Sequence, residues 1–403
     1  MSAKSRVARK RTISQPPLSA DQILRLDNIY KHKPSPKELH SLKSSNAFTI
    51  PHAGGKFDLE KAIRQIRTKD GTVSWQVEGD VKIIRGKPIE KFHLLRPGEA
   101  NEAPTLPLPP PGEGKRNSPT LPVPPPFRPE WADQIYHPKM VTRMPRPTMR
   151  RKNGDRVTPL YIWGQDARQP FFPSGYPLQC IGKLLIYTDP YSFVPSEFGT
   201  GALVGPDIVL TAAHCVPWNS NPAMIQFIPA YFEGVSTLGA NVASYVVDAS
   251  TYVDNLTNPA PAFDYAVLRL QDRLGDSLGY FGAKSYDTGW NDGNYWTLVG
   301  YPGDVAGAEE PSSQSGISFH DDDEDSNDHG DALELETENG DANHGDSGGP
   351  MFAFWDDGPY IVAVLVAEEE EYFFWPFTTE LNNVASAGPA MIQLIQWARS
   401  TWG

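Results

Sequence analysis

The sequence has little cysteine, no long hydrophobic run and no readable signal peptide. Its 403 residues include two cysteines, Cys180 and Cys215, which permit at most one internal bridge and exclude a disulfide-dense scaffold. The longest apolar run, 360–367, is far shorter than the ~20 residues of a membrane-spanning helix. The basic N-terminus lacks the apolar segment that follows it in a secretory leader. We therefore expect no membrane partner, an intracellular or non-classically exported protein, and folding that depends on buried apolar side chains.

Acidic and basic residues are unevenly distributed. Residues 1–159 contain 30 Lys and Arg against 15 Asp and Glu, and residues 160–403 contain 6 against 34, so +15 and −28 sum to −13. This asymmetry favours docking of the basic arm on the acidic half in cis, as an inhibitory prosegment would dock. A polyanion-binding tail and a solvated extension are the alternatives. Only charge favours nucleic acid, so nucleic-acid binding is unlikely from the sequence.

Proline marks the domain boundaries. Of 39 prolines, 22 lie in residues 1–159 and ten lie within 104–126, where Pro-Thr-Leu-Pro-Leu-Pro-Pro-Pro recurs as Pro-Thr-Leu-Pro-Val-Pro-Pro-Pro. The repeat predicts polyproline II, as a semi-rigid spacer or, alternatively, as a ligand for an aromatic groove. The predicted parts are a largely disordered basic extension with a small helix-hairpin patch (1–98), a proline-rich linker (99–130), a basic junction (131–159) and one domain (160–403). The patch combines a helix around residues 58–70 with a hairpin over 73–83.

The domain from Leu160 onward is predicted to be all-β. Short β-type runs separated by Gly, Pro, Asn and Asp indicate an antiparallel sandwich or barrel. Examples of these runs are 181–187, 208–211, 242–248, 265–270, 295–300, 333–337, 351–354 and 360–366. Only the C-terminus predicts a helix, with Pro389 in its first turn. The acidic run 321–325 is interpreted as a solvated loop, and we expect neither a metal nor a cofactor.

Three segments carry residues suited to acyl transfer. The glycine-rich turn 345–350 contains Ser347, and the N–H groups of Gly345 and Ser347 are candidates to stabilise an oxyanion. His214 follows an apolar strand and has a suitable pKa for accepting the serine proton. Asp264 precedes an alternating strand and would orient the imidazole. The order His, Asp, Ser suits two successive six-stranded barrels.

Together these motifs resemble the chymotrypsin-like serine peptidases over residues 160–403. The segments 161–168 and 300–304 resemble the bacterial and fungal branch that includes glutamyl endopeptidases. The resemblance implies two six-stranded barrels with a C-terminal helix, and a serine endopeptidase that acts on proteins or peptides. It assigns His214 as general base, Asp264 as its orienting carboxylate and Ser347 as nucleophile. The alternative is a catalytically silent module of the same fold, recruited through its proline repeats or basic arm. Related peptidases make an extracellular location the alternative.

The resemblance also implies specificity residues. The pocket floor lies six positions before the serine, at Asp341, where a carboxylate would favour Lys or Arg before the scissile bond. His344 and Glu368 are expected to flank the substrate. Leu365 stands where glutamate-specific relatives carry a histidine, which argues against glutamate specificity.

Activation and disulfide pairing are further implications of the resemblance. Many relatives are precursors whose freed N-terminal amine pairs with the Asp preceding the serine, here Asp346. Cleavage after Arg156 would free Val157 as that terminus. The family partner of the cysteine after the histidine normally lies nearer 199–201 than Cys180 does, so a bridge and two free thiols both remain open. Oligomeric state is not predicted.

Overall fold

The computed structural model of the chain describes residues 14–19, 22, 62–67, 73–77, 84–86, 123–129, 132, 149–150, 156–157, 166–189, 192, 194–220, 223–239, 242–253, 259–372 and 379–403. Only the backbone is described for strands within 62–86 and 149–157, and for residues 367–372 and 379–381. The predicted disorder of the extension and most of the predicted linker and junction lie outside these residues. Among the described residues, no helix is long and apolar enough to cross a membrane.

The small patch in the extension is a sheet. Strands β1 (Ala62–Arg67), β2 (Val73–Val77) and β3 (Ile84–Gly86) pair antiparallel in that order. The helix expected around 58–70 is therefore wrong over β1, where Ile63 and Ile66 have β-branched side chains that suit a strand. A hairpin forms between β2 and β3, with Trp75 opposite Ile84, so its second strand lies beyond the expected 73–83 and the expected strand residues 81–83 lie outside the described residues. The helical spacing of apolar side chains covered only a few residues, and pairing with β2 stabilises a strand there instead.

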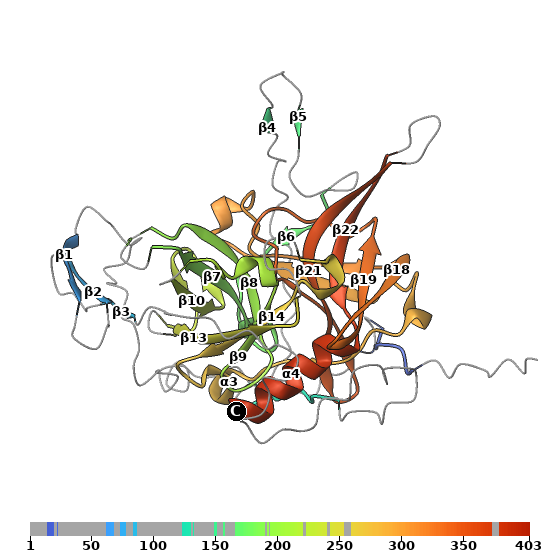
Figure 1. Cartoon of the computed structure of the whole chain (residues 1–403), viewed down its shortest axis with the longest axis horizontal. Helices are drawn as coiled ribbons and strands as arrows, with labels where there is room; N and C mark the ends of the chain where they lie inside the picture. The colour runs from blue at the N-terminus through green and yellow to red at the C-terminus, as the bar shows by residue number, and fades with distance from the viewer. Residues whose placement is uncertain are drawn as a thin grey trace, which may run out of the picture.

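The first half of the domain is a closed antiparallel barrel of six strands (Figure 1). The strands are β7 (Ile181–Tyr187), β8 (Glu197–Leu203), β9 (Ile208–Thr211), β10 (Met224–Pro229), β13 (Ser244–Thr251) and β14 (Ala266–Leu270). Their order around the barrel is β10-β13-β14-β9-β8-β7. Closure pairs every strand on both sides and leaves no open edge.

The second half is a nine-stranded sheet. Its main path runs β18-β19-β22-β21-β20-β16-β17-β6, and β15 pairs with β21. The strands are β6 (Gln169–Pro170), β15 (Gly282–Ala283), β16 (Trp296–Gly300), β17 (Ser312–Ile317), β18 (Asp321–Asn327), β19 (Gly330–Thr337), β20 (Pro350–Trp355), β21 (Gly358–Tyr372) and β22 (Thr379–Ala387). Within the described residues β18 and β6 are the two ends of the path, so this half has more strands than the six expected and its pairing does not close.

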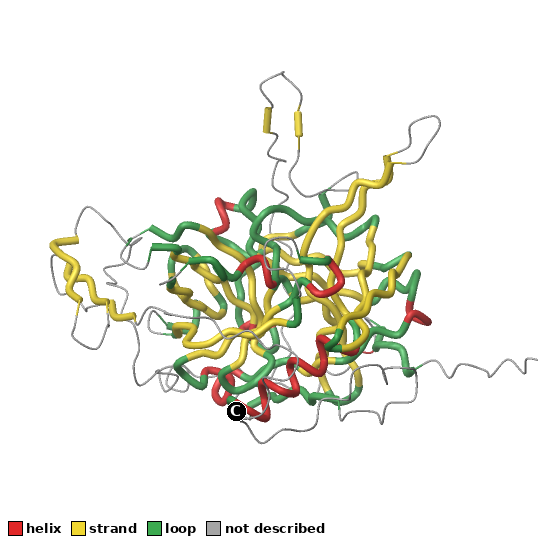
Figure 2. The backbone as a smooth tube through the Cα atoms, viewed as in Figure 1, coloured by secondary structure: helices red, strands yellow, loops and turns green. Residues whose placement is uncertain are grey.

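Short elements complete the described domain. Two small hairpins pair β4 (Met149–Arg150) with β5 (Arg156–Val157) and β11 (Tyr231–Phe232) with β12 (Val235–Ser236). The helices are α3 (Leu274–Leu278) and α4 (Pro389–Thr401). The tube in Figure 2 shows how much of the domain is strand and loop.

The acidic run is part of a hairpin. Residues 321–325 lie in strand β18, which pairs with β19 across a turn at Asn327 and Gly330, so the expected loop is a strand. Most of its side chains are exposed. A row of exposed carboxylates on an edge strand discourages pairing with another chain.

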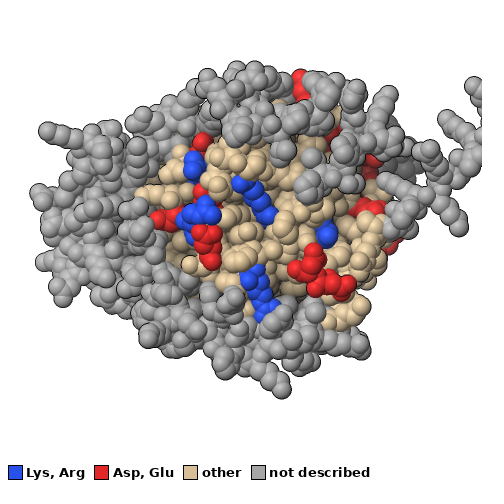
Figure 3. All heavy atoms as spheres, turned by 90° about the horizontal axis from the view of Figure 1, so that it is seen from below, with Lys and Arg blue, Asp and Glu red and all other residues tan. Residues whose placement is uncertain are grey.

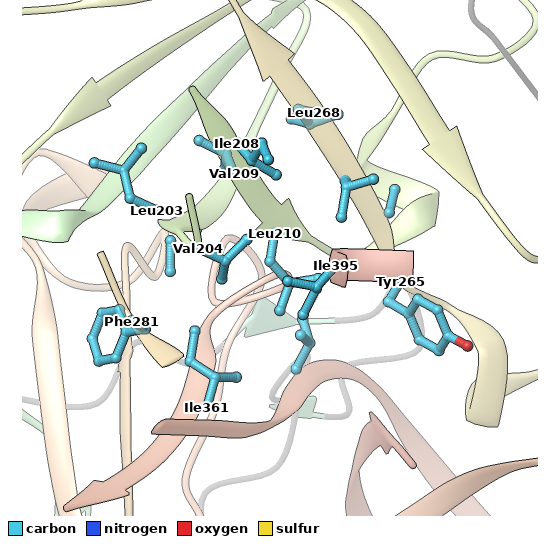
Figure 4. Close-up of a cluster of buried hydrophobic side chains, with 14 of the residues drawn as sticks. Leu203, Val204, Ile208, Val209, Leu210, Tyr265, Leu268, Phe281, Ile361 and Ile395 are labelled. Carbon is cyan, nitrogen blue, oxygen red and sulfur yellow. The ribbon is translucent and has the colours of Figure 1, made fainter. Parts of the chain in front are cut away.

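A shared core joins the barrel, the sheet and helix α4. Figure 4 shows Leu210 of the barrel, Ile361 of the sheet and Ile395 of α4 converging on one interior. Helix α4 begins with Pro389, as predicted, and buries one face. That face consists of Ala390, Met391, Ile392, Leu394, Ile395 and Ala398. Because both halves bury side chains in one core, the strand ends that carry the site are held in fixed relation.

The two cysteines are free and buried. Cys180 Sγ lies 3.4 Å from Leu278 O, whereas Cys215 Sγ lies 3.7 Å from Ser347 O, so the two thiols occupy different surroundings. Burial raises the pKa of the Cys180 thiol well above its ordinary value. A bridge between them is therefore absent.

Two short pieces of the N-terminal arm contact the domain. Trp290 Nε1 and Trp355 Nε1 donate to the carbonyl oxygens of Ser14 (3.3 Å) and Gln15 (3.0 Å). In the second proline repeat, Pro124 O accepts from Ala283 N at 3.0 Å. These are indole, proline and backbone contacts, a pattern used in polyproline recognition. Basic and acidic side chains form small separate groups on the face shown in Figure 3. Docking of the arm through opposite charge stays a prediction.

Phe127, which directly follows the second repeat, packs against Tyr280 of the domain. It exchanges two backbone hydrogen bonds with Tyr280, of 3.0 and 2.9 Å, and the two rings lie 5.3 Å apart. Arg399 Nη1 donates to Pro125 O at 2.9 Å. Residues 124, 125 and 127 therefore contact the domain directly, and the choice between spacer and ligand stays a prediction.

We expect the arm to stay bound after the chain is cut between the repeat and the domain. A site-specific protease sequence placed at residues 151–156 would make the cut, and size-exclusion chromatography would report whether the fragments co-elute. Phe127→Ala should weaken retention about tenfold, since part of an aromatic side chain and its ring contact are lost. Val123→Ala is the control, because that side chain is 46% exposed. Immediate separation of the unsubstituted fragments would contradict the expectation.

Candidate active site

His214 lies just beyond the end of strand β9. Ala212 keeps the backbone extended, and a short 3-10 turn, Ala213–Cys215, follows it. The His214 side chain remains 37% exposed. An imidazole placed at a strand end, outside the barrel interior, can exchange a proton with a bound molecule.

Asp264 is brought beside His214 by strand pairing. It follows the 3-10 turn Pro261–Phe263 and precedes β14, whose Ala266 lies opposite Thr211 of β9. Asp264 Oδ2 lies 2.6 Å from His214 Nδ1, and Oδ1 accepts from the His214 backbone N–H at 2.9 Å. A carboxylate can only accept here, so Nδ1 carries a proton, and in the neutral imidazole Nε2 then has a free lone pair.

The electrostatic surroundings of His214 favour its protonated form. Burial acts to lower its pKa, but the neighbouring Cys215 side chain and the Asp264 carboxylate raise it, and the net shift is upward. The buried carboxylate, which is 5% exposed, accounts for this direction because it stabilises an imidazolium at contact distance. A base with a raised pKa accepts a proton more readily.

Two left-handed glycines shape the turn around Ser347. Gly345 has φ +100° and Gly348 has φ +83°. A Cβ at Gly345 would collide with Tyr301 O, and one at Gly348 with Thr200 O and Thr211 Oγ1. Both positions therefore require glycine on conformational and steric grounds.

The turn that contains Ser347 contacts Cys215, the residue that follows His214. Ser347 O accepts from Thr200 N at 2.9 Å and lies 3.7 Å from Cys215 Sγ. The Ser347 residue is 8% exposed. Among the described residues no hydrogen bond joins the His214 imidazole to Ser347 Oγ. Such bonds are often long in resting hydrolases and shorten when substrate binds.

The backbone N–H groups of the turn divide into paired and available ones. Asp346 N donates to Asn343 O at 2.9 Å, Gly348 N to Leu365 O at 2.8 Å, and Gly349 N to Asp346 O at 2.7 Å. Within the described part of the chain, the N–H groups of Gly345 and Ser347 have no protein acceptor. Two unpaired donors two residues apart, beside a serine, are suited to binding a developing oxyanion.

The predicted pocket floor is buried. Asp341 is 1% exposed, its Oδ2 accepts from Ala167 N at 2.7 Å, and its own N–H donates to Gln314 Oε1 at 2.7 Å. The carboxylate thus lies in the interior close to the start of the described domain. Burial of a carboxylate is costly unless partners satisfy it.

For the other predicted substrate and activation residues, the structure gives no contact with His214, Asp264 or Ser347 among the described residues. His344 is exposed, with Nε2 3.9 Å from Glu197 Oε2 and its ring edge against Phe198. The Glu368 backbone pairs with Asn383 in the β21–β22 hairpin, and its side chain lies outside the described set. Arg156 and Val157 form β5, opposite β4, and their side chains are likewise outside it.

Asp346 has a partner that the sequence analysis missed. Arg168 Nη1 lies 3.5 Å from Asp346 Oδ2, and the same guanidinium binds Asp166 and Asp304. Burial raises the pKa of Asp346 to about 7, although Arg168 opposes this shift. The segments 161–168 and 300–304 had been singled out only for family resemblance. Their charge pattern alone does not reveal that these side chains meet in the interior.

The distribution of the site residues defines a class of fold. In chymotrypsin-like serine peptidases the histidine and aspartate come from the first β half and the serine from the second. This chain divides His214, Asp264 and Ser347 in the same way between its barrel and its nine-stranded sheet.

Comparison with known proteins agrees with this class. The family model described as Trypsin matches residues 179–370, a span that contains His214, Asp264 and Ser347. The glutamyl endopeptidase of Bacillus licheniformis is 33% identical over 112 residues, which are 26% of this chain and 33% of that protein. The chain thus matches about a third of the length of that curated relative. Residues 179–370 are therefore similar to the trypsin family, and part of the chain is similar to a glutamyl endopeptidase.

The chain is also similar to solved structures. A Glu endopeptidase in complex with MPD is 19% identical, covering 60% of this chain and 100% of its own, with a TM-score of 0.45. The protease Anisep from Arthrobacter nicotinovorans is 18% identical, covering 59% and 100%, with a TM-score of 0.42.

Proposed function

We propose that the chain is a serine endopeptidase that hydrolyses peptide bonds through an acyl-enzyme intermediate. The observation that carries the proposal is the 2.6 Å contact between Asp264 and His214, next to the glycine-bracketed turn of Ser347. The similarity of residues 179–370 to the trypsin family supports the same activity. A carboxylate, an imidazole and a hydroxyl in this order are the parts that acyl transfer requires.

Each side chain has a defined part in the proposed reaction. Ser347 Oγ attacks the scissile carbonyl carbon while His214 Nε2 takes its proton, and Asp264 stabilises the imidazolium. The oxyanion of the tetrahedral intermediate accepts from the N–H groups of Gly345 and Ser347. Collapse leaves the acyl group on Ser347, and His214 gives its proton to the departing amine. Water then repeats the steps and releases the acid.

Preference for Lys or Arg before the scissile bond is the finer part of the proposal. It rests on Asp341, which the family resemblance places at the pocket floor and which is 1% exposed. A buried carboxylate favours a substrate cation because opposite charges attract strongly in a region of low dielectric. Leu365, at the position of the histidine of glutamate-specific relatives, argues against a preference for Glu.

A ratio of two rates tests this preference. Two peptides that differ only in Lys or Leu before the scissile bond are compared in the wild type and in Asp341→Asn. We expect the wild type to prefer Lys and the ratio to fall about a hundredfold in the variant. General loss of folded enzyme cancels in the ratio. Cleavage after Glu instead would align the chain with its glutamyl endopeptidase relative and contradict the Lys or Arg preference while leaving the peptidase activity standing.

A further inference from the structure

A buried cluster of four charged side chains joins the start of the described domain to the serine turn. Arg168 Nε and Nη2 each lie 3.1 Å from an oxygen of Asp166, and Nη1 lies 3.1 Å from Asp304 Oδ1. Arg168 Nη2 also donates to Asp304 Oδ2. The remaining contact is to Asp346 Oδ2 at 3.5 Å. The Arg168 side chain is 3% exposed.

Asp346 connects this cluster to the nucleophile, since Ser347 is the next residue. Its Oδ2 also accepts from Asn343 N at 3.0 Å, and its backbone bonds to Asn343 and Gly349 close the turn. The direction of the N–H groups of Gly345 and Ser347 therefore depends on where the Asp346 side chain is held. A charged carboxylate that is 1% exposed is costly to bury, and a hydrogen-bonded partner of opposite charge offsets that cost.

Arg168 is itself held in place from both sides. The preceding residue donates its N–H to Asp341 at 2.7 Å, and the Arg168 N–H donates to Asp166 Oδ1 at 3.0 Å. The next residues, Gln169–Pro170, form β6 and pair with β17. Strand pairing thus places the Arg168 guanidinium beside Asp346, and no freed N-terminal amine is needed for this contact.

We propose that Arg168 is the positioning residue that supplies the internal cation for Asp346, so that the oxyanion turn forms without cleavage of the precursor. The inference rests on the proposed peptidase function. It replaces the expectation that an amine freed at Val157 would pair with Asp346. A planar guanidinium that already binds three carboxylates would have to be displaced by such an amine. The uncut chain then carries a competent active site. Any effect of the basic arm on activity does not depend on cleavage that frees a new N-terminus.

The first test removes and restores the cation in the full chain. Arg168→Ala should lower kcat about 10²- to 10³-fold, as loss of an oxyanion donor does, with KM within about twofold. Added guanidinium at sub-denaturing concentration should restore part of kcat, whereas urea, of similar shape without charge, should not. Arg168→Lys should be intermediate. Arg399→Ala is the control: Arg399 is partly buried, donates to Phe281 O and lies in α4, so its loss should lower stability without changing kcat.

The second test asks whether cleavage is needed. Arg156→Gln removes the expected cut, and the uncut variant should hydrolyse peptides at the wild-type rate. An inactive uncut variant, or a wild type that gains activity only when its N-terminus maps to Val157, would overturn the proposal. So would an Arg168→Ala variant with wild-type kcat. If Arg168→Ala does not fold, the Arg156→Gln and Arg168→Lys results decide. A wild type with no hydrolysis in any form would instead refute the peptidase function itself.

Discussion

Replacing Ser347 with alanine is expected to lower kcat for peptide hydrolysis by about a millionfold, to the level left by binding and the oxyanion donors alone. The reason is that Ser347 is the proposed source of the attacking oxygen, and a methyl group cannot form an acyl-enzyme. The measurement is steady-state hydrolysis of a peptide substrate, with thermal unfolding recorded on the same samples.

The fold should survive this substitution. Ser347 Oγ makes no hydrogen bond among the described residues, and its backbone bond from Thr200 N at 2.9 Å is kept in alanine. Ser400→Ala is the control, because Ser400 Oγ bonds only within the last turn of α4 and lies in no proposed site. Hydrolysis by Ser347→Ala at the rate of the Ser400→Ala control would show that another group performs the reaction.

Asp264→Asn is expected to lower kcat about 10⁴-fold while keeping the shape of the site. An asparagine amide can donate to Nδ1, which moves the imidazole proton to Nε2 and blocks its action as a base. Asp272→Asn is the matched control: Asp272 is also buried and accepts from Ser244 Oγ at 2.9 Å, so its loss should reduce stability rather than kcat.

The pH profile separates this effect from simple misfolding. His214 acts as base in its neutral form, so kcat/KM rises as pH rises through its pKa. Burial lowers that pKa, whereas the Cys215 side chain and Asp264 raise it more, so the acid limb should lie above the ordinary ~6.5. Removing the Asp264 charge should move the limb of the residual activity to lower pH. An unmoved limb would mean that Asp264 does not act on the titrating group.

Strand positions were well predicted where apolar and β-branched residues form an uninterrupted run. Strands β7 and β9 have the predicted bounds, 181–187 and 208–211, and helix α4 begins at Pro389. The bounds of strand β8 were not predicted because Gly199 and Gly201 resemble turn residues, whereas close packing requires them: a Cβ at Gly201 would meet Val209 at 2.6 Å. Strand β18 was missed because an edge strand can consist of carboxylates when its side chains face water.

The site was predictable in its local motifs and unpredictable in its supporting contacts. His214, Asp264 and Ser347 each lie in a short segment whose composition suits its chemistry. The Arg168 cluster depends on the meeting of residues 168, 304 and 346, which are far apart in the sequence and have ordinary neighbours. The free state of Cys180 and Cys215 is likewise a matter of distance in the folded chain. Contacts between residues far apart in the sequence decide both the Arg168 cluster and the state of the cysteines, and a local sequence pattern does not encode such contacts.

Labelling with a serine-directed phosphonate, followed by peptide mapping of the modified residue, tests the central claim most directly. If the imidazole, carboxylate and turn activate one hydroxyl, the uncut protein should take up one equivalent, on Ser347, and prior protonation of His214 at low pH should prevent the reaction. Failure of Ser347 to react in folded protein at any pH would identify a catalytically silent member of the family, and modification at other serines alone would contradict the assigned site.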